Sequence, residues 1–575
     1  MTARPVERSA GERVPSRPSW RATVVVLVPI LVLGAVLRLD GIDRMALWVD
    51  EAAIANVVSR GDLAAYAQYP ASNRPFGYLV LSGWLATLHN SAVVLRSTSA
   101  VPALIAMLLV VAIARMMLHS PVLVALAASM TALNGWLVAA AKEFKPYALE
   151  HALLLGWIAA ILALRRSGSR LALALLLASL PIGPLLGHAP TFALPICGAL
   201  AFAECRRRGW ASAAVSCVLV TTCGCVLAVL QFVWIGSNTP PALFGSWSAS
   251  FYDVASGLHP LEVAIWVVGR VALLLRAFVP MARDPAWDGS PSAQAFERLC
   301  IAGVVAALVR LVARREWALM ALLVGPLLPP LALGLVARWP FGPERVNLFA
   351  TTLLLLLVLL GWEALVERVD RRWVVPAFAA LFVLLQLPLD ASGLRHKDTR
   401  YGVAQEDVTL ALDEIAAREP DFVPAAGPRP ALVCNGMSGY AMRYYLAYDQ
   451  SQGPRIQALL FGRRVDWVPR PPQGDLGGLI RQRLREFPLV WVLLSHYGED
   501  DLAAARASLS DVDVEVVVER EFSGVMLLGA RLRREARGAA ATPRPAHAPR
   551  STCPGSAPVC LPSSSTTAPL TITAA

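Results

Sequence analysis

The chain has 575 residues, of which 56% are hydrophobic and 16% are charged. Its mean hydropathy is +0.54. Soluble globular domains carry about 25% charged residues, so this composition excludes an ordinary soluble domain and indicates a membrane protein. The 52 basic residues outnumber the 41 acidic ones, but most arginines lie in short clusters between apolar runs, where they orient a membrane protein. We therefore do not expect nucleic acid as a partner.

The first apolar run, residues 22–37, follows an arginine-rich N-terminal segment, residues 1–20. No small-residue cleavage site follows the run, because the next residues are Arg38, Leu39 and Asp40. The run is therefore predicted to be an uncleaved span that leaves the N-terminus in the cytoplasm. Further apolar runs occur at 76–88, 96–118, 121–140, 148–164, 171–187, 190–204, 211–235, 261–282, 299–313, 317–337, 347–367 and 373–389.

The placement of arginines indicates which of these runs cross the membrane. If all thirteen runs crossed it, the clusters Arg165–Arg166 and Arg206–Arg208 would lie outside, against the positive-inside rule. Both clusters face the cytoplasm if residues 76–88 lie along the membrane surface. Residues 261–282 are interrupted by arginines, and treating them as a second non-spanning element keeps the later arginine clusters inside as well. About eleven transmembrane helices plus juxtamembrane helices are then expected.

The expected fold class is an α-helical polytopic membrane protein whose membrane domain covers residues 21–391, with a first outer loop at 39–95. The loop at 236–260 contains no Lys or Arg, as expected for an outward-facing loop. Only three of the basic residues are lysines, and such a preference for arginine resembles the codon bias of GC-rich bacterial genomes. We therefore expect multiple passes through a bacterial cytoplasmic (inner) membrane.

From residue 392 the apolar runs shorten and charges return, which predicts a small extracytoplasmic α/β domain at 392–535. Beyond it, the Ala/Pro/Ser/Thr-rich tail at 536–575 is predicted to be disordered. Cys553 and Cys560 in that tail are equally compatible with a disulfide and with free thiols. Within the domain, strands are predicted at 431–434, 489–495, 512–518 and 525–530, and helices at 438–447, 478–486 and 499–510.

An acidic pair, Asp50 and Glu51, follows the first span directly. One interpretation is structural: Asp50 caps a short helix that begins with Glu51 and Ala52, since aspartate is common at the N-cap and acids are common in the first turn. The other interpretation is catalytic, and it follows from the resemblance described next.

The catalytic interpretation is supported by a resemblance that extends over residues 20–205. The sequence Trp48-Val49-Asp50-Glu51 in the first outer loop is followed by Arg74-Pro75-Phe76-Gly77-Tyr78, then by Arg96 at the start of a long span, and then by the second outer loop, Lys142-Glu143-Phe144-Lys145-Pro146-Tyr147-Ala148-Leu149. This succession resembles the family 39 glycosyltransferases of the GT-C class, which include protein O-mannosyltransferases and the bacterial aminoarabinose transferase. The resemblance implies a GT-C fold and transfer of a hexosyl or pentosyl group from a polyprenyl-phosphate carrier, with inversion.

The resemblance also implies roles for the acidic pair. Asp50 stands where the family has the base that accepts the proton of the acceptor hydroxyl, and Glu51 would support it. Inversion requires one such carboxylate and a leaving group on the opposite face of the sugar, in contrast to the paired carboxylates of hydrolases. The acceptor is a lipid, a glycan or a protein on the outer face.

A leaving lipid phosphate requires fixed cations. Relatives carry an Arg-Tyr pair thought to meet this phosphate, and here Val346 follows the arginine, Arg345, in place of the tyrosine. The alternative for Arg345 is an arginine that extends to the headgroup level, and Arg338 is a second candidate for the same task. The cations assigned to the donor phosphate are Arg74, Lys142, Lys145 and Arg345.

Four further residues are candidates for substrate binding: Glu143, Tyr147, Tyr78 and His188. For Glu143 the alternative is a charge neighbour of Lys145 in a solvated loop. For the two tyrosines the alternative is an interfacial aromatic belt, and for His188 it is a structural role.

No cofactor is expected, because the sequence contains no Walker loop, GxGxxG or HExxH motif and no Cys/His cluster for a metal. A divalent ion held by Asp50, Glu51 and Glu143 is the alternative that the carboxylates leave open. The rival functions are a secondary transporter, which would show matching broken spans in two halves, and a non-catalytic scaffold with an outer sensing domain.

Overall fold

The computed structural model describes residues 20–43, 46–62, 66, 74–238, 248–253, 257, 259–276, 291–342, 345–366, 399–400, 403–404, 407–423, 428–435, 437–468, 476–495, 497, 499–510, 514–522 and 524–533. The chain divides by its internal contacts into two compact units. The membrane unit comprises Met1–Asp40, Pro70–Tyr78 and Thr98–His396, and the loop–sheet unit comprises Gly41–Tyr69, Leu79–Ser97 and Lys397–Ala575.

Helices make up the membrane unit. The unit contains the start of α4 (Phe76–Leu88) and most of α5 (Ala92–Met117). Short 3-10 turns lie at Ser248–Ser250, Gly325–Leu327 and Arg345–Asn347. The other helices are α1 (Trp20–Leu39), α6 (Pro121–Leu133), α7 (Gly135–Lys142), α8 (Tyr147–Ser167), α9 (Arg170–Ser179), α10 (Gly183–Leu186), α11 (His188–Arg207), α12 (Ala211–Asn238), α14 (Pro260–Arg276), α15 (Pro291–Ala313), α16 (Trp317–Val324), α17 (Leu328–Leu335) and α18 (Leu348–Val366).

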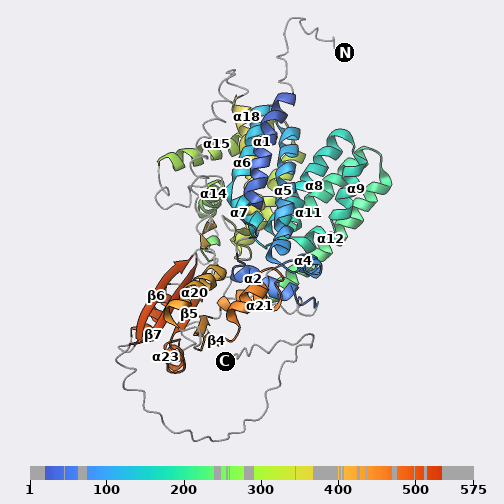
Figure 1. Ribbon diagram of the computed structural model, residues 1–575. Helices are drawn as coiled ribbons and strands as arrows, with labels where there is room; N and C mark the ends of the chain where they lie inside the picture. Colours follow the sequence, from blue (N-terminus) through green and yellow to red (C-terminus); the bar gives the residue numbers. More distant parts are fainter. Residues whose placement is uncertain are drawn as a thin grey trace, which may run out of the picture. The chain divides into compact units, whose positions relative to one another are not determined.

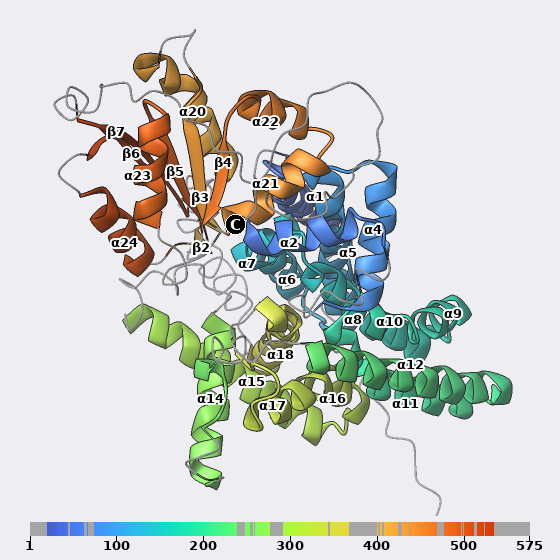
Figure 2. The same cartoon turned by 90° about the horizontal axis from the view of Figure 1, so that it is seen from below.

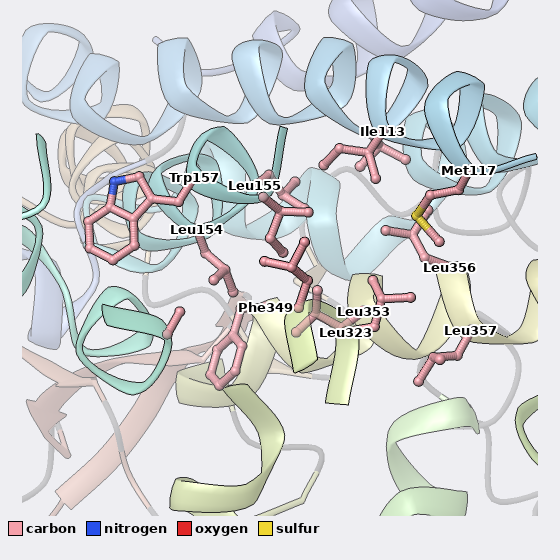
Figure 3. Packing of buried hydrophobic residues seen from close by; sticks show 14 of the residues in the cluster. Ile113, Met117, Leu154, Leu155, Trp157, Leu323, Phe349, Leu353, Leu356 and Leu357 are labelled. Carbon is pink, nitrogen blue, oxygen red and sulfur yellow. The ribbon is translucent and has the colours of Figure 1, made fainter. Parts of the chain in front are cut away.

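The core of this unit forms around α18. Residues Leu348–Glu363 of this leucine-rich helix are all buried, as expected for a helix that is apolar on every side. Figure 3 shows how Phe349 and Leu353 of α18 lie among side chains of α8 and α16, such as Leu154 and Leu323. One continuous apolar cluster therefore joins helices that are far apart in the sequence.

The helices α8, α9, α11 and α12 lie side by side at one edge of the membrane unit (Figure 1). Of these, α12 exposes large apolar side chains such as Leu219, Val229 and Val233, at 62–65% exposure. Such a surface is unfavourable in water and is expected where a helix faces lipid tails.

Five described helices have the length and apolar composition to cross a membrane, or six if the bent pair α6–α7 is counted as one span. Fewer helices pass this test than the eleven expected, partly because breaks divide some runs into shorter helices, for example at Asn134 between α6 and α7. The helices α4 and α14 are not among these five, and neither are α1, α11 and α15, so the prediction that the runs at 76–88 and 261–282 do not span stays a prediction. The total of eleven stays a prediction, and the run at 373–389 lies outside the described residues.

The loop–sheet unit contains a five-stranded sheet in the order β4-β3-β5-β7-β6, in which β3, β4 and β5 are parallel and β7 pairs antiparallel with both β5 and β6 (Figure 2). Two-residue strands β1 (Thr399–Arg400) and β2 (Val403–Ala404) pair separately. The sheet strands are β3 (Ala431–Asn435), β4 (Val465–Val468), β5 (Val490–Ser495), β6 (Val514–Phe522) and β7 (Val525–Leu532). The helices are α2 (Val49–Val58), most of α4, α20 (Val408–Phe422), α21 (Ser438–Ala447), α22 (Gly453–Leu460), α23 (Leu476–Glu486) and α24 (Glu499–Leu509).

Both faces of the sheet are covered, because successive side chains point to opposite sides. Val490, Val492 and Leu494 of β5 join a cluster that includes residues of α23 and α24. Trp491, between them, contacts Phe422 of α20 edge to face on the other side. The three-layer arrangement confirms the α/β prediction. The predicted strands and helices are present, β4, α20 and α22 are additional, and the tail at 536–575 with Cys553 and Cys560 lies outside the described residues.

The crossing of α15 and α18 yields a prediction about stability. A Cβ atom at Gly361 would lie 1.7 Å from the carbonyl oxygen of Gly303, so the two backbones must separate to admit it. We expect Gly361→Ala to cost about 1–3 kcal/mol by overpacking, seen as a lower thermal unfolding temperature in detergent. Gly269→Ala on α14, where nothing lies within 4 Å, is the control and should be neutral or stabilising. Equal unfolding temperatures would contradict the close crossing.

Candidate active site

The acidic pair lies in the first turn of α2, in the loop–sheet unit. The helix begins at Val49, and Trp48 is its N-cap residue, so Asp50 and Glu51 are the second and third residues of the helix. The Glu51 carboxylate accepts a hydrogen bond from the Trp48 backbone N–H at 3.3 Å. The interpretation of Asp50 as the N-cap residue is therefore wrong, because the backward capping bond is made by Glu51.

Glu51 is bound on both carboxylate oxygens by Arg96, near the start of α5. The Arg96 Nε lies 3.2 Å from one oxygen and its Nη2 lies 2.9 Å from the other, and both side chains have no exposed surface. Arg96 also donates to the carbonyl groups of Ile42 and Ala46. Asp50, by contrast, is partly exposed. The two adjacent acids therefore occupy different environments.

The second outer loop of the membrane unit, residues 142–147, is bonded to several distant segments. Glu143 is 4% exposed, and Arg345 approaches its two carboxylate oxygens at 3.5 and 3.4 Å. The alternative of a solvated Glu143 is therefore wrong. The same contact brings together two residues that sequence reasoning assigned to different parts of the substrate.

The middle of this loop packs on α4 and α5. The ring of Phe144 lies against that of Tyr78, with centroids 5.8 Å apart, and the Tyr78 hydroxyl lies 3.1 Å from that of Thr98. The Ser99 hydroxyl donates to the Lys145 carbonyl at 2.7 Å. Lys145 itself is fully buried, so the ammonium group lies inside the unit.

Arg74 and Tyr147 form a third contact of the loop. The Arg74 Nη1 donates to the Tyr147 hydroxyl at 2.8 Å, and its guanidinium lies 5.4 Å from the ring centroid. Tyr147 is 7% exposed and Tyr78 is 0% exposed. Neither tyrosine therefore belongs to a lipid-facing aromatic belt.

The ring of His188 lies 5.2 Å from that of Trp339. Beside it, the Ala189 N–H donates to the carboxylate of Glu150 at 3.4 Å. Sequence reasoning missed both Glu150 and His151, which are 2% and 3% exposed. The available signal was an acid next to a histidine inside an apolar run, since ionisable groups there are rarely accidental.

The candidate residues thus fall into two groups. Asp50 and Glu51 belong to the loop–sheet unit, and the assigned cations and substrate-binding residues belong to the membrane unit. Lys142 is partly exposed and Arg338 is exposed. Within the described part of the chain, no group of three or more His, Cys, Asp or Glu side chains is arranged to hold a metal ion.

No known protein family matches the chain, and no curated protein matches it. Among solved structures, the chain is similar to crystal structures of ArnT from Cupriavidus metallidurans, one in the apo state and one bound to undecaprenyl phosphate. Each alignment has 14% sequence identity and a TM-score of 0.33, and it covers 89% of this chain and 98% of the ArnT chain.

The ion pair between Glu51 and Arg96 leads to a prediction about stability. Arg96→Met leaves a buried carboxylate without its cation and should cost about 3–5 kcal/mol. Combining it with Glu51→Met removes the uncompensated charge and should restore most of the loss, measured as thermal unfolding in detergent. Arg506→Ala, which breaks the exposed pair with Glu519, is the control and should cost about 0–1 kcal/mol. A double variant as unstable as Arg96→Met would contradict a charge-based explanation.

Proposed function

We propose that this chain is an integral membrane glycosyltransferase of the GT-C class. It transfers one sugar, hexosyl or pentosyl, from a polyprenyl-phosphate carrier to an acceptor on the extracytoplasmic face of the bacterial inner membrane. The acceptor is a lipid, a glycan or a protein. The apolar helices support a membrane location, and the motifs of the first two outer loops support the reaction class.

The observation that best supports the proposal is that the two neighbouring carboxylates, Asp50 and Glu51, differ in burial and in hydrogen bonding. Both oxygens of Glu51 are bound by Arg96 and the side chain is fully buried, so Glu51 is unsuited to accept a proton from a substrate. Asp50 is partly exposed and lies in the first turn of α2, where the helix N-terminus favours the ionised carboxylate. That ionised form is the one that acts as a general base.

The reaction follows from this assignment. Asp50 accepts the proton of an acceptor hydroxyl while its oxygen forms a bond to the anomeric carbon. The bond from that carbon to the phosphate oxygen breaks on the opposite face, which inverts the configuration and releases polyprenyl phosphate. Arg74, Lys142, Lys145 and Arg345 are the cations that we assign to the phosphate charge.

The proposal assigns substrate contacts to Glu143 and Tyr147, which are 4% and 7% exposed. Tyr78 was a third candidate from the sequence, but it is fully buried against Phe144 and Thr98, so its role here is to support the second outer loop. His188 is retained as an acceptor-side candidate. No step of the reaction is assigned to a metal ion, and the absence of a metal requirement stays a prediction from the sequence.

The first test compares the wild-type chain with Asp50→Asn in membranes at matched expression. We expect transfer from radiolabelled polyprenyl-phosphate sugars to fall by ~10²-fold or more, because proton transfer by a placed base contributes about 10²–10⁴-fold. Asp43→Asn, an exposed acid of the same outer loop, should retain full transfer.

Two outcomes would contradict the proposal. Full activity of Asp50→Asn would remove Asp50 as the base. If the wild-type chain transferred no sugar from any carrier but moved a solute across vesicles, the transporter interpretation would replace it.

A second test addresses the donor phosphate. Arg345→Ala should raise the apparent KM for the polyprenyl-phosphate sugar more than Asp50→Asn does, because a ground-state phosphate contact acts mainly on KM. Arg345→Lys keeps the charge and should have the smaller effect. Arg60→Ala, an exposed arginine of the first outer loop, is the charge-matched control. An unchanged KM in Arg345→Ala would assign Arg345 to the membrane headgroup level instead.

A further inference from the structure

Helix α21 of the C-terminal α/β domain lies directly against α2, the helix that carries Asp50 and Glu51. Figure 1 and Figure 2 both show the two helices side by side within the loop–sheet unit. The two helices are separated by about 390 residues of sequence, so this contact depends on the folding of the C-terminal domain. Three tyrosines of α21 take part in contacts that hold the first outer loop.

Hydrogen bonds join α21 to both ends of α2. At the N-terminal end, the Leu47 backbone N–H donates to the Tyr445 hydroxyl at 2.7 Å. At the C-terminal end, the Asn56 side-chain amide donates to the Tyr440 carbonyl at 2.8 Å and to the Ala52 carbonyl at 2.7 Å. The short helix is thus fixed at two points against one partner helix.

The turn between α4 and α5 is held by the same segment. The Tyr444 hydroxyl donates to the Asn90 side chain at 3.2 Å, and the Gln450 N–H donates to the Asn90 carbonyl at 2.8 Å. The Ala92 N–H donates to the carboxylate of Asp449 at 3.3 Å. These bonds fix the first residues of α5, one turn before Arg96.

The ion pair between Glu51 and Arg96 lies between these two sets of contacts. Tyr445 is 1% exposed and interacts electrostatically with Arg96, as does Asp407, the N-cap residue of α20. Burial raises the pKa of Tyr445 above its ordinary value, although Arg96 opposes the increase. The phenol therefore stays protonated at neutral pH and acts as a neutral hydrogen-bonding group.

We propose that the C-terminal α/β domain serves as a positioning element for the catalytic carboxylate, with Tyr445 as the principal positioning residue. This inference rests on the proposed function. Leu47, which Tyr445 binds, is three residues before Asp50 and immediately before the N-cap of α2. The bond therefore sets where the helix begins and where its second residue lies. Displacements of about 1 Å at a catalytic group are enough to cost 10²-fold in rate.

The test uses the full-length protein and Tyr445→Phe, which removes one hydroxyl and keeps the ring. We expect kcat for sugar transfer to fall about 10- to 100-fold, with the apparent KM for the polyprenyl-phosphate sugar unchanged. A general loss of folded protein would instead lower the amount of active enzyme in proportion to the folded fraction, so rates are normalised to protein that retains the wild-type elution volume. Tyr448→Phe, at the end of the same helix, is the matched control and should leave kcat unchanged.

Hydrogen exchange provides a readout that does not depend on activity. In Tyr445→Phe, the amides of residues 47–52 should exchange faster, while those of α24 stay at the wild-type rate. Asn56→Ala, which releases the other end of α2, should give the same pattern and replaces Tyr445→Phe if that variant does not fold.

The outcomes separate this inference from the proposed function. Faster exchange at residues 47–52 together with lower kcat supports the positioning role. Wild-type kcat in Tyr445→Phe and Asn56→Ala overturns it, whether or not exchange changes. If the wild-type chain transfers no sugar at all, the proposed function fails, and the positioning of a catalytic carboxylate by Tyr445 fails with it. Faster exchange would still identify α21 as the support of α2.

Discussion

The buried ion pair between Glu51 and Arg96 determines the local structure of the first outer loop. Two opposite charges without solvent are costly unless their remaining hydrogen-bonding groups are satisfied. Here the guanidinium binds both carboxylate oxygens and two backbone carbonyl groups, and the carboxylate also accepts the N–H of Trp48. The pair therefore defines the start of α2 and occupies one of two adjacent acids. Asp50, the other of these two acids, is partly exposed.

In the second outer loop, the sequence was enough to identify candidate residues but not their partners or their burial. The residue types were identifiable, because acids and bases are rare near apolar spans. Their partners were not identifiable, because Glu143 binds Arg345, which is more than 200 residues away in the sequence. No pattern of neighbouring residues predicts such a long-range pair. Burial was equally hidden: Lys145 looks like a solvated loop residue in the sequence and is fully enclosed in the structure. The family resemblance suggested roles for these residues, whereas the contacts in the structure explain the conformation of the loop.

The fold was predictable where one pattern dominated. The strand β5 is a run of β-branched and apolar residues between polar ones, so both its position and its burial follow from the sequence. The strand β4 was missed because Asp466 stands in its centre. That charge is bound by Arg483 of α23 at 2.5 and 3.0 Å and by Arg464 at 3.3 Å. Likewise, the apolar run at 121–140 concealed the break at Asn134, whose side chain accepts the Leu137 N–H and starts a new helix. In each case a side chain distant in sequence or a local cap overrode the hydrophobic pattern.

The two contact units differ from the domains predicted from the sequence, which were continuous segments at 21–391 and 392–535. Residues 41–69 and 79–97, which include most of the apolar run at 76–88, are grouped by their contacts with the C-terminal strands and helices. Tyr445 explains part of this grouping, since its hydroxyl is bonded to Leu47 and its ring is enclosed with that of Tyr444, 5.4 Å away. A soluble domain that only captured acceptors would need no buried contact with the helix that carries Asp50. The buried contacts between α21 and α2 instead link the conformation of residues 47–58 to the folded C-terminal domain, so a loss of structure in that domain would remove the bonds of Tyr445 and Tyr440 to this segment.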